Sequence, residues 1–373
     1  MRVLLAGGGT AGHCNPAIAI ASMIRAKNKD AEILFIGNEG KIEETLVKKA
    51  GFTFRAVKTQ GFRRKLSADN IKTVYLYLKA RDHCRAIIRE FRPDLVIGTG
   101  GYVSGPVVAA AQSMKIPTCI HEQNAYPGMT SKMLARRADI VFISFPGSEQ
   151  YFHGARKLVL SGNPLREEVL CTAREDARLK LGIPKDGFYL LSFAGSLGAR
   201  EINRAMADFI IRNARSKDFY QIHATGERGW EWMPETLGKK GFDTQKKGMI
   251  TVCPYLYDMP LHLAAADAVI SRAGAITLGE LTALGKAAVL IPSPNVTHNH
   301  QYYNARALSD RGGALLLEEK DLSADRLYEM ILELKQDPAR RRSLGRHAKE
   351  LALPQATEVI YRELYQLIHP ERK

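Results

Sequence analysis

The sequence predicts an α/β protein built from two Rossmann-like domains, and three observations lead to this class. Short apolar runs typical of buried parallel strands alternate with longer stretches whose apolar residues recur at helical spacing. Four of these runs end in glycine-rich turns, which is where the strands of an open parallel sheet meet their ligands. The chain also has 373 residues, too many for a single hydrophobic core, so two domains are expected.

The first half contains a regular series of these alternations. Strands are expected at residues 2–6, 33–36, 95–97, 118–120 and 140–144, and helices at 16–27 and 42–49. The apolar run 107–114 follows the turn after the 95–97 strand. Strands that alternate with helices in this way predict a parallel sheet covered by helices on both faces.

The pattern restarts in the second half. Strands are expected at residues 189–193, 268–271 and 288–291; the turn AGSLGAR echoes LLAGGGTAGH, and RAGAITLGE echoes GTGGYVSGP. We therefore expect one domain at 1–163 and a second at 164–354, with the linker near 161–164. After Pro354, a last helix at 357–368, within the segment 355–373, is expected to cross back onto the first domain.

The amino-acid composition limits the kinds of partner and the cellular environment that we expect for this protein. The formal charge is +15, from 54 lysines and arginines against 39 aspartates and glutamates, which predicts an anionic partner such as nucleic acid, anionic lipid or a phosphorylated substrate. Five cysteines without metal-ligand spacing indicate reduced thiols in a cytosolic protein. No signal peptide is expected. No apolar run reaches the roughly 18 residues of a spanning helix, so any membrane contact is expected at its surface.

The glycine-rich turns lie at 7–12, 98–105, 195–198 and 274–280. Glycines allow close backbone approach, and the N–H groups of the following helix start favour phosphate. One such turn is as readily structural, but four in one chain favour phosphate or diphosphate ligands. The first turn fits G-x-G-x-x-G, yet Glu39 is poorly placed to hold a ribose and His13 follows the third glycine directly, which disfavours a nicotinamide dinucleotide.

Polar residues follow two expected strands of the first half. A histidine at a helix start, as His13 is, is kept neutral by the helix dipole and can take a proton from a hydroxyl beside a bound diphosphate. His121, Glu122 and Asn124 follow the 118–120 strand, and any of them could orient a sugar. The alternative for Asn124 is that it only caps the helix after Pro127.

The second half offers groups for a nucleotide sugar. Glu280 is expected in the first turn of a helix, where a carboxylate either caps the helix or accepts the hydroxyls of a ribose. Asn299, His300 and Gln301 carry donors suited to sugar hydroxyls. No two aspartates lie two positions apart, so the Asp-x-Asp metal clamp is absent. We expect no cofactor and no metal in the chemistry, with the leaving diphosphate neutralised by backbone N–H groups and basic side chains.

Seven stretches together carry a resemblance: GGGTAGH (7–13), GTGGYVSGP (98–106), HEQNAYPG (121–128), SGNPLR (161–166), GSLGAR (195–200), SRAGAITLGE (271–280) and HQYYNA (300–305). In these motifs and their order the chain closely resembles the family 28 glycosyltransferases that make lipid II from lipid I in bacterial peptidoglycan synthesis. The resemblance implies a GT-B fold, with two domains facing a cleft. It also implies inverting transfer of GlcNAc from UDP-GlcNAc to the MurNAc C4 hydroxyl of undecaprenyl-linked lipid I, peripherally at the cytoplasmic face of the cell membrane, with no nucleic acid partner.

The resemblance also assigns roles to residues. As catalytic candidates, His13 and Asn124 would lie near the acceptor hydroxyl. The acceptor diphosphate would be held by Gly9, Thr10, Gly12, Gly100, Gly101 and Tyr102. The UDP-GlcNAc set would comprise Arg166, Ser196, Gly198, Leu256, Arg272, Gly274, Ala275, Ile276, Thr277, Glu280, His300 and Gln301, together with Thr10, Gly12 and Asn124. The chain departs from the family pattern at Ala11, commonly glycine, and at His300, commonly glutamine.

Two alternatives stay open at this point. One is another UDP-sugar enzyme of the same fold, such as a glycolipid transferase or a UDP-GlcNAc epimerase. The other is a non-catalytic protein that binds a nucleotide sugar or a lipid head group. Turnover of UDP-GlcNAc with a short-chain lipid I analogue separates them.

The stretch 61–93 is the most basic part of the chain. Its cations are Arg63, Arg64, Lys65, Lys72, Lys79, Arg81, Arg85, Arg89 and Arg92. Ile71, Val74, Tyr75 and Leu78 are spaced as one face of a helix. That face is either part of the core or an interfacial surface whose cations lie against anionic lipid.

Overall fold

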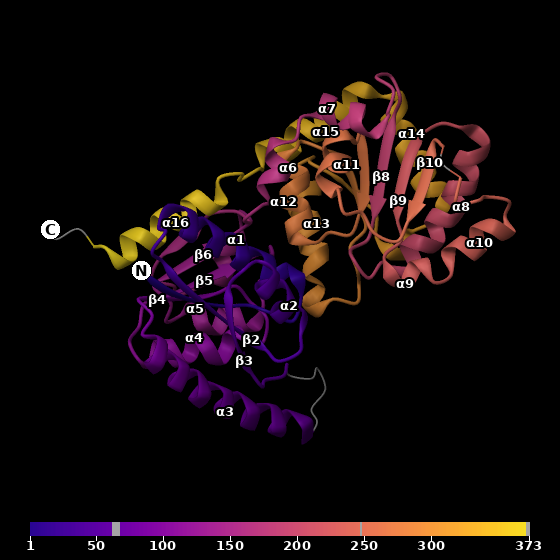
Figure 1. Cartoon of the computed structure of the whole chain (residues 1–373). Helices are drawn as coiled ribbons and strands as arrows, with labels where there is room; N and C mark the ends of the chain where they lie inside the picture. The colour runs from indigo at the N-terminus through magenta and orange to yellow at the C-terminus, as the bar shows by residue number, and fades with distance from the viewer. Residues whose placement is uncertain (62–67, 247, 371–373) are drawn as a thin grey trace. The chain divides into compact units, whose positions relative to one another are not determined.

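The computed structural model describes residues 1–61, 68–246 and 248–370. The chain divides into two compact units, Met1–Leu165 with Leu353–Lys373, and Arg166–Ala352. The predicted boundaries at 163/164 and 354/355 compare with 165/166 and 352/353 here. Each unit contains one parallel sheet with helices on both faces (Figure 1), which confirms the predicted fold class of two Rossmann-like domains.

The sheet of the first unit has seven strands in the order β3-β2-β1-β4-β5-β6-β7. Its strands are β1 (Arg2–Ala6), β2 (Glu32–Asn38), β3 (Thr53–Val57), β4 (Leu95–Gly98), β5 (Thr118–Glu122), β6 (Ile140–Ile143) and β7 (Leu158–Leu160). Its helices are α1 (Ala11–Lys27), α2 (Ile42–Lys49), α3 (Ala68–Phe91), α4 (Ser104–Ser113), α5 (Met129–Ala135) and α16 (Ala356–Ile368), with a short 3₁₀ turn at Ser148–Tyr151.

This sheet is buried on both faces, as the continuous apolar runs of its strands require. Along β1, Val3 and Leu5 join one core cluster while Leu4 and Ala6 join the other, because successive strand residues point to opposite faces. The C-terminal helix α16 lies beside α1 (Figure 1), and Ile360 belongs to the same cluster as Val3. The last residues of the chain therefore complete the core of the first unit.

The sheet of the second unit has six strands in the order β10-β9-β8-β11-β12-β13. Its strands are β8 (Tyr189–Phe193), β9 (Tyr220–Ala224), β10 (Ile250–Cys253), β11 (Ala268–Ser271), β12 (Ala287–Leu290) and β13 (Leu315–Leu316). Its helices are α6 (Glu167–Cys171), α7 (Arg174–Leu181), α8 (Arg200–Ser216), α9 (Glu227–Trp230), α10 (Met233–Lys239), α11 (Met259–Ala265), α12 (Ala275–Ala283), α13 (His300–Ser309), α14 (Ala324–Gln336) and α15 (Pro338–Glu350), with 3₁₀ turns at Thr297–Asn299 and Glu319–Asp321.

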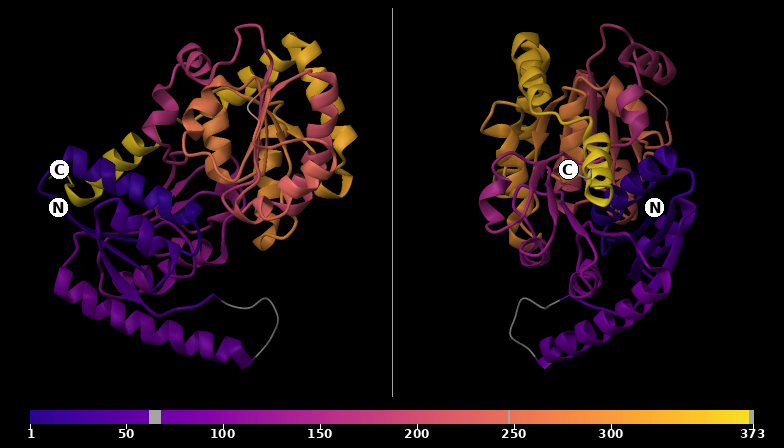
Figure 2. Two further views of the ribbon diagram at one scale, coloured as in Figure 1. Left: turned by 45° about the vertical axis from the view of Figure 1, so that its right-hand side comes forward. Right: turned by 90° about the vertical axis from the view of Figure 1, so that its left-hand side faces the viewer.

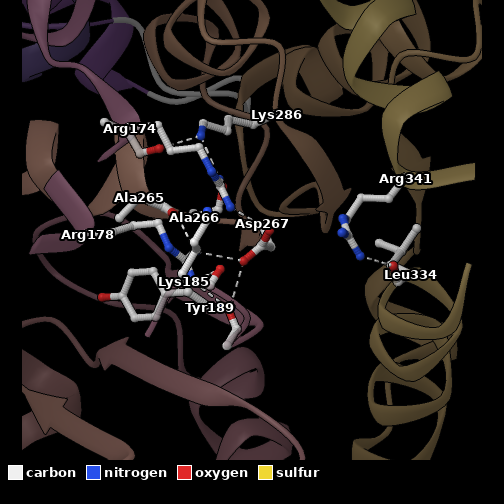
Figure 3. A network of polar contacts seen from close by, with 12 residues as sticks. Arg174, Arg178, Lys185, Tyr189, Ala265, Ala266, Asp267, Lys286, Leu334 and Arg341 are labelled. Carbon is white, nitrogen blue, oxygen red and sulfur yellow. Dashed lines mark hydrogen bonds and ion pairs between the residues drawn. The ribbon is translucent and has the colours of Figure 1, made fainter. Parts of the chain in front are cut away.

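A polar cluster ties α7 and α11 to the sheet of the second unit (Figure 3). The carboxylate of Asp267 accepts from Arg174 at 2.7 Å, from Arg178 at 3.0 Å and from the backbone N–H of Tyr189 at 2.9 Å. Lys286 donates to the carbonyls of residues 264 and 266 at 2.6 and 3.0 Å. Burial lowers the pKa of Lys286 to about 7. This cluster stands where β8 and β11 begin, so it anchors the end of the sheet opposite to the glycine-rich loops.

One helix differs from its predicted bounds in a way that matters for the site. Helix α1 begins at Ala11, five residues before Pro16, which the sequence pattern suggested as its start. Pro16 is the sixth residue of this helix, so its missing N–H removes the one hydrogen bond that would run to the carbonyl of Gly12. As a result, Gly12 and His13 belong to the first helical turn.

Candidate functional site

In the first unit, the loops after β1 and β4 are interlocked by glycine. Gly101 has a φ of +76°, and a Cβ there would overlap the carbonyl oxygen of Gly8. The backbone N–H of Gly8 donates to the carbonyl of Gly100 at 3.4 Å. A Cβ on Gly9 would lie 3.2 Å from the ring of Tyr102. The structure thus brings together Gly9, Gly100, Gly101 and Tyr102, all predicted for the acceptor diphosphate.

A buried carboxylate that the sequence analysis missed holds this loop. Glu43 of α2 is fully buried and accepts from the N–H of Gly9 and from the N–H of Asn38, each at 3.1 Å. The N–H of Gly9 therefore points at Glu43 in this structure. Ala11 and Gly12 lie in the first turn of α1, where N–H groups have no intrahelical acceptor. Thr10 precedes them as the N-cap, so the helix start is the part of the loop best suited to an anion.

Two hydrogen bonds, to residues that directly follow β5 and β4, hold His13 in place. Its Nδ1 lies 2.9 Å from Oε1 of Gln123, and its carbonyl accepts from the hydroxyl of Thr99 at 2.7 Å. Neither Gln123 nor Thr99 was among the predicted site residues. Their side chains are buried, and only the pairing of β1, β4 and β5 brings them to His13.

The prediction that His121 or Glu122 orients a sugar directly is wrong, because both are buried. Strand β5 reaches Glu122, two residues beyond the predicted end. His121 is fully buried, with Nε2 lying 3.0 Å from the carbonyl oxygen of Gly162, and burial lowers its pKa to about 4. Glu122 accepts from the N–H and Nδ2 of Asn124 and from the N–H of Gly128. The N-cap of α5 is Gly128, so the alternative in which Asn124 caps that helix is also wrong.

In the second unit, the loop after β8 carries Ser196 and Gly198. Ser196 is exposed, and its carbonyl accepts from the N–H of Glu227 at 3.1 Å. Gly198 has a φ of +77°, and a Cβ there would overlap the carbonyl oxygen of Thr225. The loops after β8 and β9 are therefore packed backbone against backbone, which leaves the side chain of Ser196 on the outer side.

Glu280 lies in the second turn of α12, the sixth residue of that helix, and not in the first turn as predicted. It therefore does not cap the helix. Its Oε1 accepts from Nη2 and Nε of Arg166 at 2.8 and 3.2 Å, while its side chain is 7% exposed. Burial raises the pKa of Glu280, and Arg166 opposes that shift. The structure thus brings together two residues that were predicted on the same nucleotide and stand 114 positions apart in the sequence.

Helix α12 follows the glycine-rich turn after β11. Gly274 is its N-cap with extended backbone, Ala275, Ile276 and Thr277 form its first turn, and helix starts favour anions. Arg272 donates to the carbonyls of residues 291 and 292 at 3.1 and 3.2 Å and pairs with Glu319. Arg272 therefore ties the end of β11 to the loop after β12.

The remaining predicted donor residues lie in the loop after β10 and at the start of α13. Leu256, between β10 and α11, is buried, whereas Tyr255 and Tyr257 beside it are exposed, and their rings meet edge to face with centroids 4.9 Å apart. Gln301 accepts from the N–H of Ser293 at 2.9 Å through Oε1. His300 begins α13, and its Nδ1 lies 2.9 Å from the carbonyl oxygen of residue 297.

Comparison with known proteins identifies the family. Residues 3–143 match the glycosyltransferase family 28 N-terminal domain, and residues 189–360 match the family 28 C-terminal domain. A protein of Acetivibrio thermocellus is 47% identical over 361 residues, which cover 97% of this chain and 96% of that protein. The chain belongs to glycosyltransferase family 28.

The family 28 relatives share one name. The Acetivibrio protein is named UDP-N-acetylglucosamine–N-acetylmuramyl-(pentapeptide) pyrophosphoryl-undecaprenol N-acetylglucosamine transferase. A Bacillus cereus protein carries the same name with the suffix 1 and is 42% identical, over 99% of this chain and all of that protein. These findings confirm the resemblance read from the motifs and make this family 28 chain a glycosyltransferase.

Solved structures agree with the family 28 assignment. A crystal structure of Acinetobacter baumannii MurG is 26% identical and covers 98% of this chain and 99% of its own, with a TM-score of 0.78. This match confirms the GT-B fold. A UDP-GlcNAc 2-epimerase from Neisseria meningitidis has the same fold, with a TM-score of 0.66 at 12% identity, over 98% of this chain and all of its own.

In this family 28 member the described part of the basic segment lies mainly in helix α3, which runs along the outside of the first unit (Figure 2). Val74, Tyr75 and Leu78 are 46%, 62% and 43% exposed, so the alternative in which they form core is wrong. Arg63, Arg64 and Lys65, and the side chains of Ile71 and Lys72, lie outside the described residues. Among the helices that the structure describes, none is long and apolar enough to cross a membrane.

Proposed function

We propose that this chain transfers GlcNAc from UDP-GlcNAc to the C4 hydroxyl of MurNAc in lipid I, with inversion, giving lipid II and UDP. The observation that carries the proposal is the 47% identity, over nearly the whole of both chains, to an enzyme named for that transfer. The alternatives of the same fold rest on matches at 12–15% identity, which concern the fold alone.

The proposed chemistry is a single displacement. The acceptor hydroxyl oxygen forms a bond to C1 of GlcNAc as the bond from C1 to the UDP oxygen breaks, and UDP leaves with the electron pair. Nε2 of His13, in the first turn of α1, takes the hydroxyl proton as the general base. Asn124, held by Glu122, would position the acceptor.

The donor groups would lie in the second unit. The first turn of α12 and the Ser196–Gly198 loop would stabilise the charge that develops on the UDP phosphates. Glu280, oriented by Arg166, would accept the ribose hydroxyls. Because these groups are backbone dipoles and side chains, the proposed reaction needs no metal ion.

Turnover distinguishes the candidate functions. UDP release that requires a short-chain lipid I analogue supports transfer, release of free ManNAc supports epimerisation, and binding of UDP-GlcNAc without turnover supports a binding protein. His13→Ala should reduce turnover about 10²–10⁴-fold while UDP still binds. Turnover near the wild-type rate would refute His13 as the base.

We also propose that the first unit binds the cytoplasmic leaflet through a surface on α3 and α5, the lipid face, defined by Val74, Tyr75, Leu78, Met129 and Met133. The two methionines are 69% and 57% exposed. The two helices flank the start of α4, because a Cβ on Gly105 would lie 3.2 Å from Tyr77 of α3 and 3.5 Å from Thr130 of α5. Exposed apolar residues beside Lys79 suit an anionic interface.

Vesicle binding tests the lipid face. Tyr75→Glu with Leu78→Glu should abolish sedimentation with anionic vesicles but leave turnover of a water-soluble acceptor intact. Leu179→Glu, at an 82% exposed leucine of the second unit, is the matched control. Equal vesicle binding by both variants would place the membrane contact elsewhere.

A further inference from the structure

A chain of hydrogen bonds runs behind His13 and begins at a backbone carbonyl. Nε2 of His121 lies 3.0 Å from the carbonyl oxygen of Gly162. A carbonyl only accepts, so Nε2 carries a hydrogen. Burial lowers the pKa of His121 to about 4, which keeps the ring neutral at physiological pH and leaves a lone pair on Nδ1. Nδ1 therefore accepts from the amide nitrogen of Gln123, 2.9 Å away.

The surroundings of Gln123 determine which way its amide points. Its nitrogen lies 2.8 Å from the carbonyl oxygen of Thr99 and 3.0 Å from that of His121. An amide oxygen in that position would face two acceptors and have no donor, so the nitrogen must be there. The amide nitrogen therefore has three acceptors, the two carbonyls and Nδ1 of His121, for its two hydrogens. One hydrogen points to one acceptor, and the other hydrogen is shared between the remaining two. Gln123 is only 2% exposed, so water does not compete for these contacts.

The amide oxygen of Gln123 then faces the histidine proposed as the base. Oε1 lies 2.9 Å from Nδ1 of His13, and because Oε1 can only accept, Nδ1 must carry a hydrogen. A neutral ring with its hydrogen on Nδ1 has its lone pair on Nε2. We infer that Gln123 is a positioning residue that holds His13 in the Nδ1–H tautomer and so presents Nε2 as the proton-accepting atom.

Gly100 leaves space for the contact between His13 and Gln123, and Thr99 forms hydrogen bonds with both of these residues. A Cβ on Gly100 would lie 2.7 Å from Nδ1 of His13, so a side chain there would push the ring away from Gln123. Thr99 accepts from Gln123 through its carbonyl and donates from its hydroxyl to the carbonyl of His13. The backbone of His13 and the amide of Gln123 are thus held by the same residue of the loop after β4.

Nitrogen NMR of histidine-labelled protein tests the tautomer without any substrate. The ¹⁵N signals of His13 are identified by their loss in His13→Gln. At pH 8 we expect a protonated Nδ1 and an unprotonated Nε2, and the reverse pattern would overturn the inference. In Gln123→Met the pattern should shift towards Nε2–H. The control is Gln112→Met, which also replaces a glutamine of the first unit whose half-buried amide donates to a backbone carbonyl, that of residue 134. This variant should leave the His13 signals unchanged.

Kinetics then connect the tautomer to the reaction. Gln123→Met should lower kcat about 10–100-fold, the range seen when a partner that orients a histidine is removed, and leave KM for UDP-GlcNAc unchanged. Unchanged kcat in a folded Gln123→Met variant whose His13 tautomer has changed would refute the positioning role.

This inference rests on the proposed role of His13 as base, and the two can fail separately. If His13→Ala retains turnover, the proposed base is wrong, yet the wild-type ¹⁵N pattern still decides the tautomer. If the base is supported and the wild-type pattern shows Nε2–H, the inference about Gln123 is wrong. The wild-type spectrum also settles the question if Gln123→Met does not fold.

Discussion

The stability of the second unit should depend on pH through one buried histidine. His223 of β9 is fully buried between Ser192 of β8 and Asn203 of α8. Its Nδ1 lies 2.9 Å from the hydroxyl oxygen of Ser192, and its Nε2 lies 3.2 Å from Oδ1 of Asn203. Asn203 in turn donates to the carbonyl of Thr225, the residue against which Gly198 packs. Protonation of His223 would therefore disturb the support of the Ser196–Gly198 loop.

The size of the change in the free energy of unfolding follows from the pKa of His223 in the folded chain and in the unfolded chain. Burial lowers the pKa of His223 to about 4, whereas an unfolded histidine has its ordinary value near 6.5. Between these pH values the unfolded chain binds a proton that the folded chain does not, so the free energy of unfolding rises with pH. The contribution of neutral His223 is fully present above pH 6.5 and is lost as the pH falls to 4. The difference amounts to about 3 kcal/mol.

Urea denaturation followed by tryptophan fluorescence measures this effect in the right unit. Both tryptophans of the chain, Trp230 and Trp232, pack on the core of the second unit. The free energy of unfolding is compared between wild type and His223→Gln at pH 7 and at pH 4, which cancels the titration of carboxylates common to both. The variant should be less stable at pH 7, and the gap should shrink by about 3 kcal/mol at pH 4.

His347→Gln, at a partly exposed histidine of α15 in the same unit, controls for the loss of a histidine as such. A gap between wild type and His223→Gln that stays constant from pH 7 to pH 4 would refute the reasoning. It would mean that His223 binds its proton equally well in the folded and unfolded chain, and therefore that burial does not govern its titration.

Three further outcomes are expected. Arg166→Met removes the cation beside Glu280, so the pKa of Glu280 should rise further and UDP affinity, measured by calorimetry, should recover as the pH is raised; affinity independent of pH would contradict the pairing. Gly101→Ala should abolish turnover and leave UDP affinity unchanged, because a Cβ there overlaps Gly8, whereas Gly128→Ala, with nothing within 4 Å, should be harmless; an active Gly101→Ala would show that the loops need not interlock. Activity should survive EDTA, and loss that Mg²⁺ restores would contradict the metal-free proposal.

Much of the fold could be predicted because strands such as β1, β8 and β11 are short, largely apolar and followed by a glycine turn. β1, β8 and β11 have the bounds read from the sequence. The errors lie where local pattern and tertiary structure differ. Pro16 looked like a helix start because proline favours the first turn, but the helix begins earlier and accepts the proline within it.

The loops of the candidate site were predictable where glycine geometry determines them and not where strand pairing does. Gly101 and Gly198 stand in glycine-rich turns, so their loops could be recognised from the sequence. Glu43 was not singled out from the sequence, because its burial under Gly8 depends on how α2 packs beside β1 and β2. Gln123 lay within a recognised motif, yet its role depends on which groups surround its amide, and the sequence does not contain that information.

Each unit has a buried, neutral histidine close to its glycine-rich loops, and the hydrogen-bonding capacity of a neutral imidazole explains why that side chain suits the position. His121 accepts at Nδ1 from Gln123 and donates from Nε2 to the carbonyl of Gly162. His223 accepts at Nδ1 from the Ser192 hydroxyl and donates from Nε2 to Asn203. A neutral imidazole offers one acceptor and one donor on opposite sides of a rigid ring, so it can satisfy a buried donor and a buried acceptor at once. Protonation of His121 turns Nδ1 into a donor that faces the amide nitrogen of Gln123, which is itself a donor. Protonation of His223 costs chiefly the burial of the charge, because the Ser192 hydroxyl can accept as well as donate. Acid should therefore loosen the loops of both units within the same pH range.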